Sequence, residues 1–196
     1  MSKKAGLVVV DVQNDFCPGG SLGIADGDRV VIAINRYVEQ FAAVGAPIFA
    51  TRDWHPPQTR HFKIYGGVWP VHCVQNTEGA EFHSALRLSS TATVLSKGTM
   101  ADADSYSGFD ALDEHGIDLA VLLRARGVEH IFVGGLATDY CVRQTVLDGL
   151  QQGFDVTVLL DAIRGVDLVP GDSARALEEM SLAGARTIHG VEELPC

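Results

Sequence analysis

The sequence predicts an α/β protein with a doubly wound, mostly parallel sheet of about six strands and helices on both faces. Short apolar, β-branched runs alternate with amphipathic segments of helical period along the whole chain. The 196 residues can bury a full core without disulfide or metal staples. No repeat, low-complexity stretch or linker interrupts them, so residues 1–196 are expected to form a single domain.

The first predicted strand, residues 5–10, is a continuous apolar run that stops at Asp11. A loop rich in turn-forming residues follows this strand. Asp26 or Asp28 is expected to cap the next helix, because apolar residues with helical spacing begin shortly after them. Gly45 is expected to end that helix.

The second predicted strand, residues 47–52, ends at Asp53. Residues 53–91 then show neither helical nor strand periodicity and are rich in His, Pro, Gly and Trp. Loops of this length in compact domains are usually functional or disordered, and the aromatic content favours a functional loop. A third strand is predicted at 92–95, with Lys97 just after it.

A fourth strand, residues 130–133, is predicted to end in a turn at Gly134 and Gly135. Thr138 and Asp139 are candidate N-caps for the amphipathic helix that follows. The remaining predicted elements are a helix at about 118–126, a strand at 155–160, a helix at 173–183 and a short strand near 187–188.

The charge and cysteine content limit the classes of function. Acidic residues outnumber basic ones by 25 to 15, which argues against binding to nucleic acid or to an anionic membrane. A small neutral or cationic substrate is compatible with this charge. The chain shows no CxxC motif, signal peptide or membrane-spanning run, so a cytoplasmic protein with reduced thiols is expected. Cys17, Cys73 and Cys196 are expected to be unreactive thiols.

Reactive side chains follow four of the predicted strands. They are Asp11, Asp53, Lys97 and Cys141. In doubly wound parallel sheets, ligands bind outside the carboxyl ends of the strands, where the strand order reverses. The sequence therefore predicts that these four side chains meet at one edge of the sheet.

Cys141 is the candidate nucleophile. A free cysteine is most often a small buried apolar residue, but this one stands in the first turn of a predicted helix, where the helix dipole favours a thiolate. Lys97 is expected to lower the thiol pKa as well, and Asp11 to accept the thiol proton and return it to a leaving amine. The backbone N–H groups of Ala137 and Cys141 are candidates for an oxyanion hole.

A metal site is predicted in the long loop. Asp53 and His55 are two residues apart, so an extended backbone points both side chains to one side. His61 and His72 stand in the same loop. One carboxylate with two or three imidazoles suits one divalent transition metal ion, Zn²⁺, Fe²⁺ or Mn²⁺. Loop histidines are often merely solvated, and their clustering favours the metal site here.

Seven motifs together resemble one enzyme family. They are VDVQNDF at 10–16, PGGSL at 18–22, DWH at 53–55, WPVHC at 69–73, KG at 97–98, DSYSGF at 104–109 and GLATDYCV at 135–142. In this order they resemble the nicotinamidase (pyrazinamidase) family of isochorismatase-like cysteine hydrolases, over nearly the whole chain. Each motif alone is weakly specific, whereas the combination is highly specific.

The resemblance implies roles for individual residues. The catalytic triad that it implies is Asp11, Lys97 and Cys141. The metal ligands that it implies are Asp53, His55 and His72, with His61 as a further ligand in some members. The substrate pocket that it implies consists of Phe16, Leu22, Trp69, Tyr106 and Ala137. It also implies a cis peptide bond before Ala137, and it places Tyr140 where some relatives have histidine.

The activity that the resemblance implies is hydrolysis of nicotinamide to nicotinate and ammonia through a thioester on Cys141, with pyrazinamide as a second substrate. The expected protein is a monomer or a homo-oligomer. An N-carbamoyl or ureido amidase is the nearest alternative and would not need the histidine loop, and a catalytically silent binding protein is another. Isochorismatase chemistry, which uses no cysteine nucleophile, is disfavoured by Cys141. A nucleotide-binding or redox module is disfavoured because GxGxxG and CxxC motifs are missing.

Overall fold

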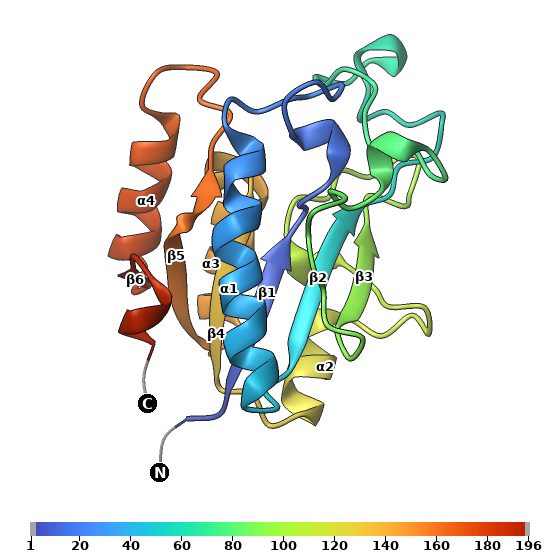
Figure 1. Cartoon of the computed structure of the whole chain (residues 1–196). Helices are drawn as coiled ribbons and strands as arrows, with labels where there is room; N and C mark the ends of the chain where they lie inside the picture. The colour runs from blue at the N-terminus through green and yellow to red at the C-terminus, as the bar shows by residue number, and fades with distance from the viewer. Residues whose placement is uncertain (1–2, 195–196) are drawn as a thin grey trace.

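The computed structural model describes residues 3–194, and its strands form one six-stranded sheet (Figure 1). The strands are β1 (Ala5–Val10), β2 (Ile48–Asp53), β3 (Thr93–Lys97), β4 (His130–Leu136), β5 (Asp155–Arg164) and β6 (Arg186–Ile188). Their order is β3-β2-β1-β4-β5-β6, and every neighbouring pair is parallel. The predicted doubly wound parallel sheet is confirmed, and the strand order reverses between β1 and β4.

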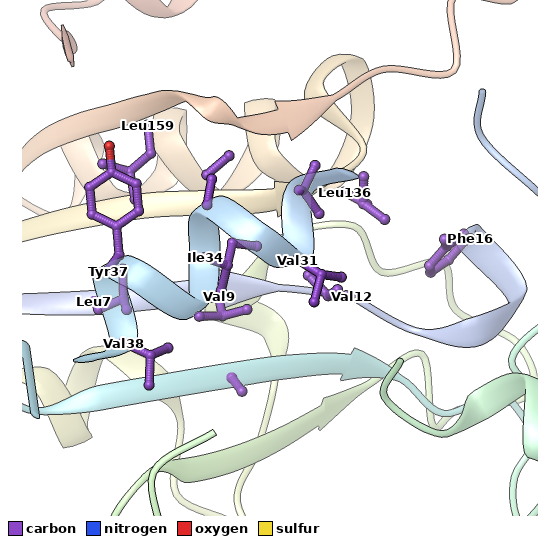
Figure 2. Close-up of a cluster of buried hydrophobic side chains, with 14 of the residues drawn as sticks. Leu7, Val9, Val12, Phe16, Val31, Ile34, Tyr37, Val38, Leu136 and Leu159 are labelled. Atoms are coloured by element: carbon purple, nitrogen blue, oxygen red, sulfur yellow. The ribbon is translucent and has the colours of Figure 1, made fainter. Parts of the chain in front are cut away.

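Helices cover both faces of the sheet. They are α1 (Val30–Ala43), α2 (Leu119–Ala125), α3 (Arg143–Gln151) and α4 (Asp172–Leu182). On one face, Leu7 and Val9 of β1 pack in a cluster with Ile34 of α1 (Figure 2). On the other face, Val8 and Val10 belong to a cluster that includes residues of α2, α3 and α4. Because alternate side chains of β1 are buried on opposite faces, the strand is apolar throughout.

The two glycines of β4 do not form the predicted turn. The strand continues through Gly134 and Gly135 to Leu136, and its pairing with β5 shifts in register between Val133 and Gly135. Gly135 has φ of 130°, and a Cβ atom there would collide with the carbonyl oxygen of Val10. Gly135 therefore allows β4 to lie close against β1 beyond the point where a turn was predicted, while Gly134 faces Ala162 of β5.

The predicted caps of α3 are also wrong. A single π-helical turn, Thr138–Val142, joins β4 to α3, and its N-cap residue, Ala137, makes no side-chain capping bond. The carboxylate of Asp139 instead accepts hydrogen bonds from the backbone N–H groups of Val166 and Asp167, at 2.9 and 2.8 Å. Asp139 thus fastens this turn to the segment that follows β5.

The other element boundaries agree with the sequence to within a few residues. The N-terminal cap of α1 is an exception, since a 3₁₀ turn, Gly27–Arg29, precedes the helix and neither aspartate caps it through its side chain. Between β2 and β3 the chain forms no α-helix or strand, as predicted, but two 3₁₀ turns. No helix within residues 3–194 has the length and apolar character that crossing a membrane requires.

Gly135→Ala should destabilise the protein severely, because the new methyl group has no room against β1 and the backbone is left-handed. We expect the free energy of unfolding to fall by about 3 kcal/mol or more in urea denaturation. Gly153→Ala is the matched control: φ is 87° but nothing lies within 4 Å of the added Cβ atom, so about 1 kcal/mol is expected. Equal losses in the two variants would contradict the packing role of Gly135.

Candidate active site

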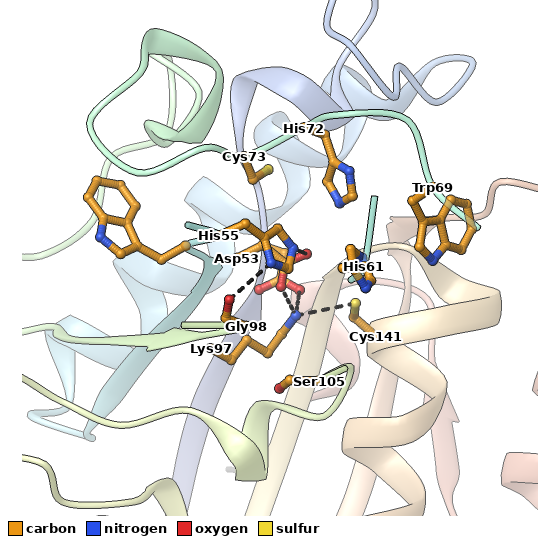
Figure 3. A network of polar contacts seen from close by, with 12 residues as sticks. Asp53, His55, His61, Trp69, His72, Cys73, Lys97, Gly98, Ser105 and Cys141 are labelled. Atoms are coloured by element: carbon orange, nitrogen blue, oxygen red, sulfur yellow. Dashed lines mark hydrogen bonds and ion pairs between the residues drawn. The ribbon is translucent and has the colours of Figure 1, made fainter. Parts of the chain in front are cut away.

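The ends of β1, β2, β3 and β4 bring four reactive side chains together, of which Figure 3 labels Asp53, Lys97 and Cys141. Asp11 follows β1, Asp53 and Lys97 are the last residues of β2 and β3 and lie opposite each other in register, and Cys141 lies in the turn after β4. All four are buried. The four side chains predicted from the strand ends therefore do cluster at the carboxyl ends of the strands, where the strand order reverses.

Lys97 is the centre of this cluster. Its Nζ atom lies 2.9 Å from Asp11 Oδ2 and 3.5 Å from Cys141 Sγ, and it forms an ion pair with Asp53 Oδ1. The other oxygen of Asp11 accepts a hydrogen bond of 2.7 Å from the hydroxyl of Thr51. Asp11 has φ of 48°, a left-handed conformation that is uncommon for residues other than glycine and is found at active sites.

Burial controls the protonation of the candidate nucleophile, Cys141. Loss of solvation raises the pKa of the Cys141 thiol well above its ordinary value, and Lys97 offsets this only in part because two carboxylates act against it. The expected lowering of the thiol pKa is therefore not found. Burial also raises the pKa of Asp11, again against the influence of Lys97. The site thus places a thiol that holds its proton beside a carboxylate that is a stronger base than a free aspartate.

Asp53 and Lys97 form the permanently charged pair. Burial alone would raise the pKa of Asp53, but Lys97 and the neighbouring imidazoles hold it below its ordinary range. Burial alone would likewise lower the pKa of Lys97, but Asp11 and Asp53 raise it well above its ordinary value. The ammonium therefore stays charged next to the thiol.

Three buried imidazoles form a second group beside the first. His55, His61 and His72 offer ring nitrogens that all lie within 4.8 Å of one another. Each Nδ1 has an acceptor: the Gly98 carbonyl at 3.0 Å for His55, Asp104 Oδ1 at 2.6 Å for His61, and the Pro70 carbonyl at 2.8 Å for His72. These acceptors place the proton on Nδ1 and leave each Nε2 free to bind a ligand.

The chemistry of this group fits a divalent transition metal ion. The Nε2 atom of His55 is buried without a hydrogen-bond partner and lies 3.7 Å from Asp53 Oδ2. A buried ring nitrogen in this state is costly unless it binds something. Burial lowers the pKa of His72 to about 4, so its imidazole is neutral, as a metal ligand must be. The three histidines predicted as metal ligands thus lie together, and the fourth predicted ligand, Asp53, lies beside His55.

An aromatic cavity opens onto both groups. It has a volume of about 360 Å³, part of it open to solvent, and Asp53, His61, His72 and Cys141 contribute to its wall. All five residues predicted for the substrate pocket line it: Phe16, Leu22, Trp69, Tyr106 and Ala137. The peptide bond between Leu136 and Ala137 is cis, as the resemblance implies.

Other residues of the site were not found from the sequence. Ile24 and Val166 line the cavity. Tyr140, to which the resemblance had already pointed, also lines it, and its ring packs edge-on against Trp69 with centroids 4.9 Å apart. Val166 follows β5 at the same edge of the sheet, so the rule that located the other strand ends could have found it. The hydrogen bond that His61 donates to Asp104 left no signal in the spacing of the motifs.

Gln13 is a further residue that the sequence did not single out. Its buried amide donates to the carbonyl oxygens of Asp53 and Ala80 and accepts a hydrogen bond from the Asp53 N–H, each at 2.8 Å. Both backbone polar groups of Asp53 are thereby fixed by one side chain.

The remaining cysteines agree with the sequence-based expectation as far as the structure describes them. Cys17 and Cys73 are buried free thiols, and burial raises the pKa of Cys17 to about 11. Unlike Cys141, neither of these two thiols lines the aromatic cavity. Cys196 lies outside the described residues.

Comparison with known proteins shows the family to which the chain belongs. The family model described as Isochorismatase domain matches residues 5–190. The chain is 43% identical to the nicotinamidase of Escherichia coli strain K12, over 91% of this chain and 92% of that protein. It is 42% identical to the nicotinamidase/pyrazinamidase of Mycobacterium tuberculosis, over 93% of this chain and 97% of that protein.

A solved structure agrees in both sequence and shape. The crystal structure of the pyrazinamidase of Pyrococcus horikoshii in complex with zinc superimposes with a TM-score of 0.88 at 46% identity. The match covers 95% of this chain and 99% of the other. The similarity therefore extends over the sheet, the long histidine loop and the segment that follows β5.

Gln13→Leu should weaken the support of Asp53, because it leaves the Asp53 N–H and two carbonyl oxygens buried without partners. We expect the free energy of unfolding to fall by about 2–4 kcal/mol in urea denaturation. The matched control is Gln75→Leu, which removes one hydrogen bond of 2.9 Å from a half-buried side chain to the Trp54 carbonyl. About 1 kcal/mol is expected there, and similar losses in both variants would contradict the role of Gln13.

Proposed function

Because the chain belongs to the isochorismatase domain family and is an amidohydrolase, we propose that it hydrolyses nicotinamide to nicotinate and ammonia, and pyrazinamide to pyrazinoate. One observation carries the proposal: Cys141 Sγ lies 3.5 Å from Lys97 Nζ in the wall of an aromatic cavity that also receives buried imidazoles. This arrangement suits a small, flat amide whose ring has its own metal-binding nitrogen.

Acylation begins with proton transfer from Cys141 to Asp11. The donor atoms of these residues lie within 4.8 Å of one another, and the raised pKa of Asp11 makes it a suitable base. The thiolate attacks the carboxamide carbon, and the backbone N–H groups of Ala137 and Cys141 receive the developing oxyanion. The C–N bond then breaks, Asp11 returns the proton to the leaving ammonia, and a thioester remains on Cys141.

Deacylation uses the same residues in reverse. Asp11 accepts a proton from a water molecule, which attacks the thioester carbon. The C–S bond breaks, the acid product leaves, and the proton on Asp11 returns to the sulfur. Lys97 keeps its positive charge throughout and stabilises each anion that forms beside it, because its pKa is held far above neutrality.

Metal ligation is proposed for Asp53, His55, His61 and His72. When bound there, a divalent ion supplies an electrophilic partner for the ring nitrogen of the substrate. Zinc is one of the three ions that this ligand set suits, together with iron and manganese. Phe16 and Trp69, which line the cavity, are proposed to hold the substrate ring between them.

Other expectations from the sequence stay predictions. They concern the single domain over residues 1–196, the cytoplasmic location and the choice between a monomer and a homo-oligomer. None of them is needed for the proposed chemistry, since all residues assigned to it lie on one described chain.

Cys141→Ala should abolish ammonia release from nicotinamide, with a fall in kcat on the order of 10⁴-fold or more, because the covalent step is lost. Cys17→Ala is the matched control, since Cys17 is a buried thiol that does not line the cavity, and it should retain activity. Substantial hydrolysis by the Cys141 variant would contradict the mechanism. Faster hydrolysis of a ureido compound than of nicotinamide by the unmodified protein would contradict the proposed substrate.

Metal removal should weaken nicotinamide binding. The Cys141→Ala variant allows equilibrium binding to be measured without turnover, before and after dialysis against a chelator. We expect about a 10-fold or greater loss of affinity, restored by zinc, iron or manganese, because the ring nitrogen loses its partner. Unchanged binding after complete removal of the metal would contradict the anchoring role of the ion.

A further inference from the structure

The three imidazoles differ in what holds them. The Nδ1 atoms of His55 and His72 donate to backbone carbonyl oxygens, which are neutral and fixed by the main chain. The Nδ1 atom of His61 donates to a carboxylate oxygen of Asp104, at 2.6 Å. A charged acceptor makes a stronger hydrogen bond than a neutral one.

The contact between Asp104 and His61 joins a buried group to an exposed one. The side chain of His61 is 4% exposed, whereas that of Asp104 is 59% exposed. The loop that bears Asp104 is fastened to the histidine loop next to this contact, since the Arg60 N–H donates to the Ala101 carbonyl at 2.8 Å. Asp104 thus reaches the Nδ1 atom of His61 from the solvent side, while one face of the ring packs on His55.

This geometry determines which ring nitrogen of His61 is available to bind a metal ion. A carboxylate only accepts, so the Nδ1 atom of His61 carries the proton and Nε2 keeps its lone pair. The ring of His61 stacks on that of His55, with centroids 4.5 Å apart and planes 21° apart. An acceptor that holds Nδ1–H of a ligating imidazole in this way also increases the basicity of the other ring nitrogen, and so strengthens its bond to the metal.

We propose that Asp104 is a positioning residue that holds His61 as a direct ligand and thereby sets the affinity of the site for its divalent ion. The inference rests on the proposed function, because it requires that the imidazole group binds a metal. Asp104 itself touches neither the ion nor the substrate in this proposal and acts through His61.

The test measures metal affinity. Zn²⁺ is titrated into the metal-free full-length protein in competition with a chromophoric chelator. Asp104→Asn should bind Zn²⁺ about 10–100-fold more weakly than the unmodified protein. Asp102→Asn is the matched control, because it removes the same charge from an exposed position on the same loop and should leave the affinity unchanged. Equal affinities for the two variants would overturn the proposal.

Two further measurements distinguish the positioning of His61 by Asp104 from a purely electrostatic effect of the Asp104 charge on the ion. In a protein that already carries His61→Asn, the Asp104→Asn substitution should cause no additional loss of Zn²⁺ affinity. An undiminished loss would show that Asp104 acts through its charge alone and would overturn the proposal. The visible spectrum of the Co²⁺-loaded Asp104→Asn variant should shift toward that of His61→Asn, since both weaken the same ligand. A spectrum identical to that of the unmodified protein would also contradict the proposed role of Asp104.

The outcomes distinguish this inference from the proposed function. An unmodified protein that releases ammonia from nicotinamide but binds no Zn²⁺ overturns the metal assignment and this inference together. An unmodified protein that binds Zn²⁺, with an Asp104→Asn variant that binds it equally well, overturns this inference alone. Weakened Zn²⁺ binding in a protein inactive on nicotinamide supports the role of Asp104 and contradicts the proposed substrate.

Discussion

The site depends on the burial of one ammonium group between two carboxylates. Lys97 has no exposed side-chain surface, and a lone charge in that position would cost several kcal/mol. Asp11 and Asp53 compensate it, and the sheet fixes all three because they stand at the ends of adjacent parallel strands. The register that pairs Asp53 with Lys97 is therefore as much a part of the chemistry as the side chains themselves. Removing Lys97 would leave the two carboxylates buried within 4.8 Å of each other without a counter-charge.

Asp53 joins the two halves of the site. One of its oxygens forms an ion pair with Lys97, and the other faces the unpartnered Nε2 atom of His55 at 3.7 Å. Gln13 holds the Asp53 backbone from both sides. A displacement of Asp53 would therefore disturb the nucleophile and the proposed metal ligands together. Because each oxygen of Asp53 faces a different group, the same carboxylate is paired with the Lys97 ammonium and also lies beside the imidazoles.

The sequence located the site better than it located the elements that shape it. Strand ends are readable because apolar runs stop abruptly at charged residues such as Asp11 and Asp53. The continuation of β4 through Gly135 was not readable, because a glycine pair ordinarily indicates a turn and the close approach of Val10 is a tertiary fact. The contact between Asp104 and His61 joins residues 43 apart. A spacing pattern cannot predict such a contact, since it depends on how two irregular loops pack.

The state of Cys141 follows from how its turn is held. Helix capping was expected to fix this turn and the helix dipole to favour a thiolate. Asp139 instead bonds to the segment after β5, and the sulfur is buried beside two carboxylates, so its pKa rises. Oxidation of a thiol requires thiolate character and exposure, and Cys141 at rest has little of either. In the proposed mechanism the thiolate is therefore generated by proton transfer to Asp11 rather than by the helix dipole.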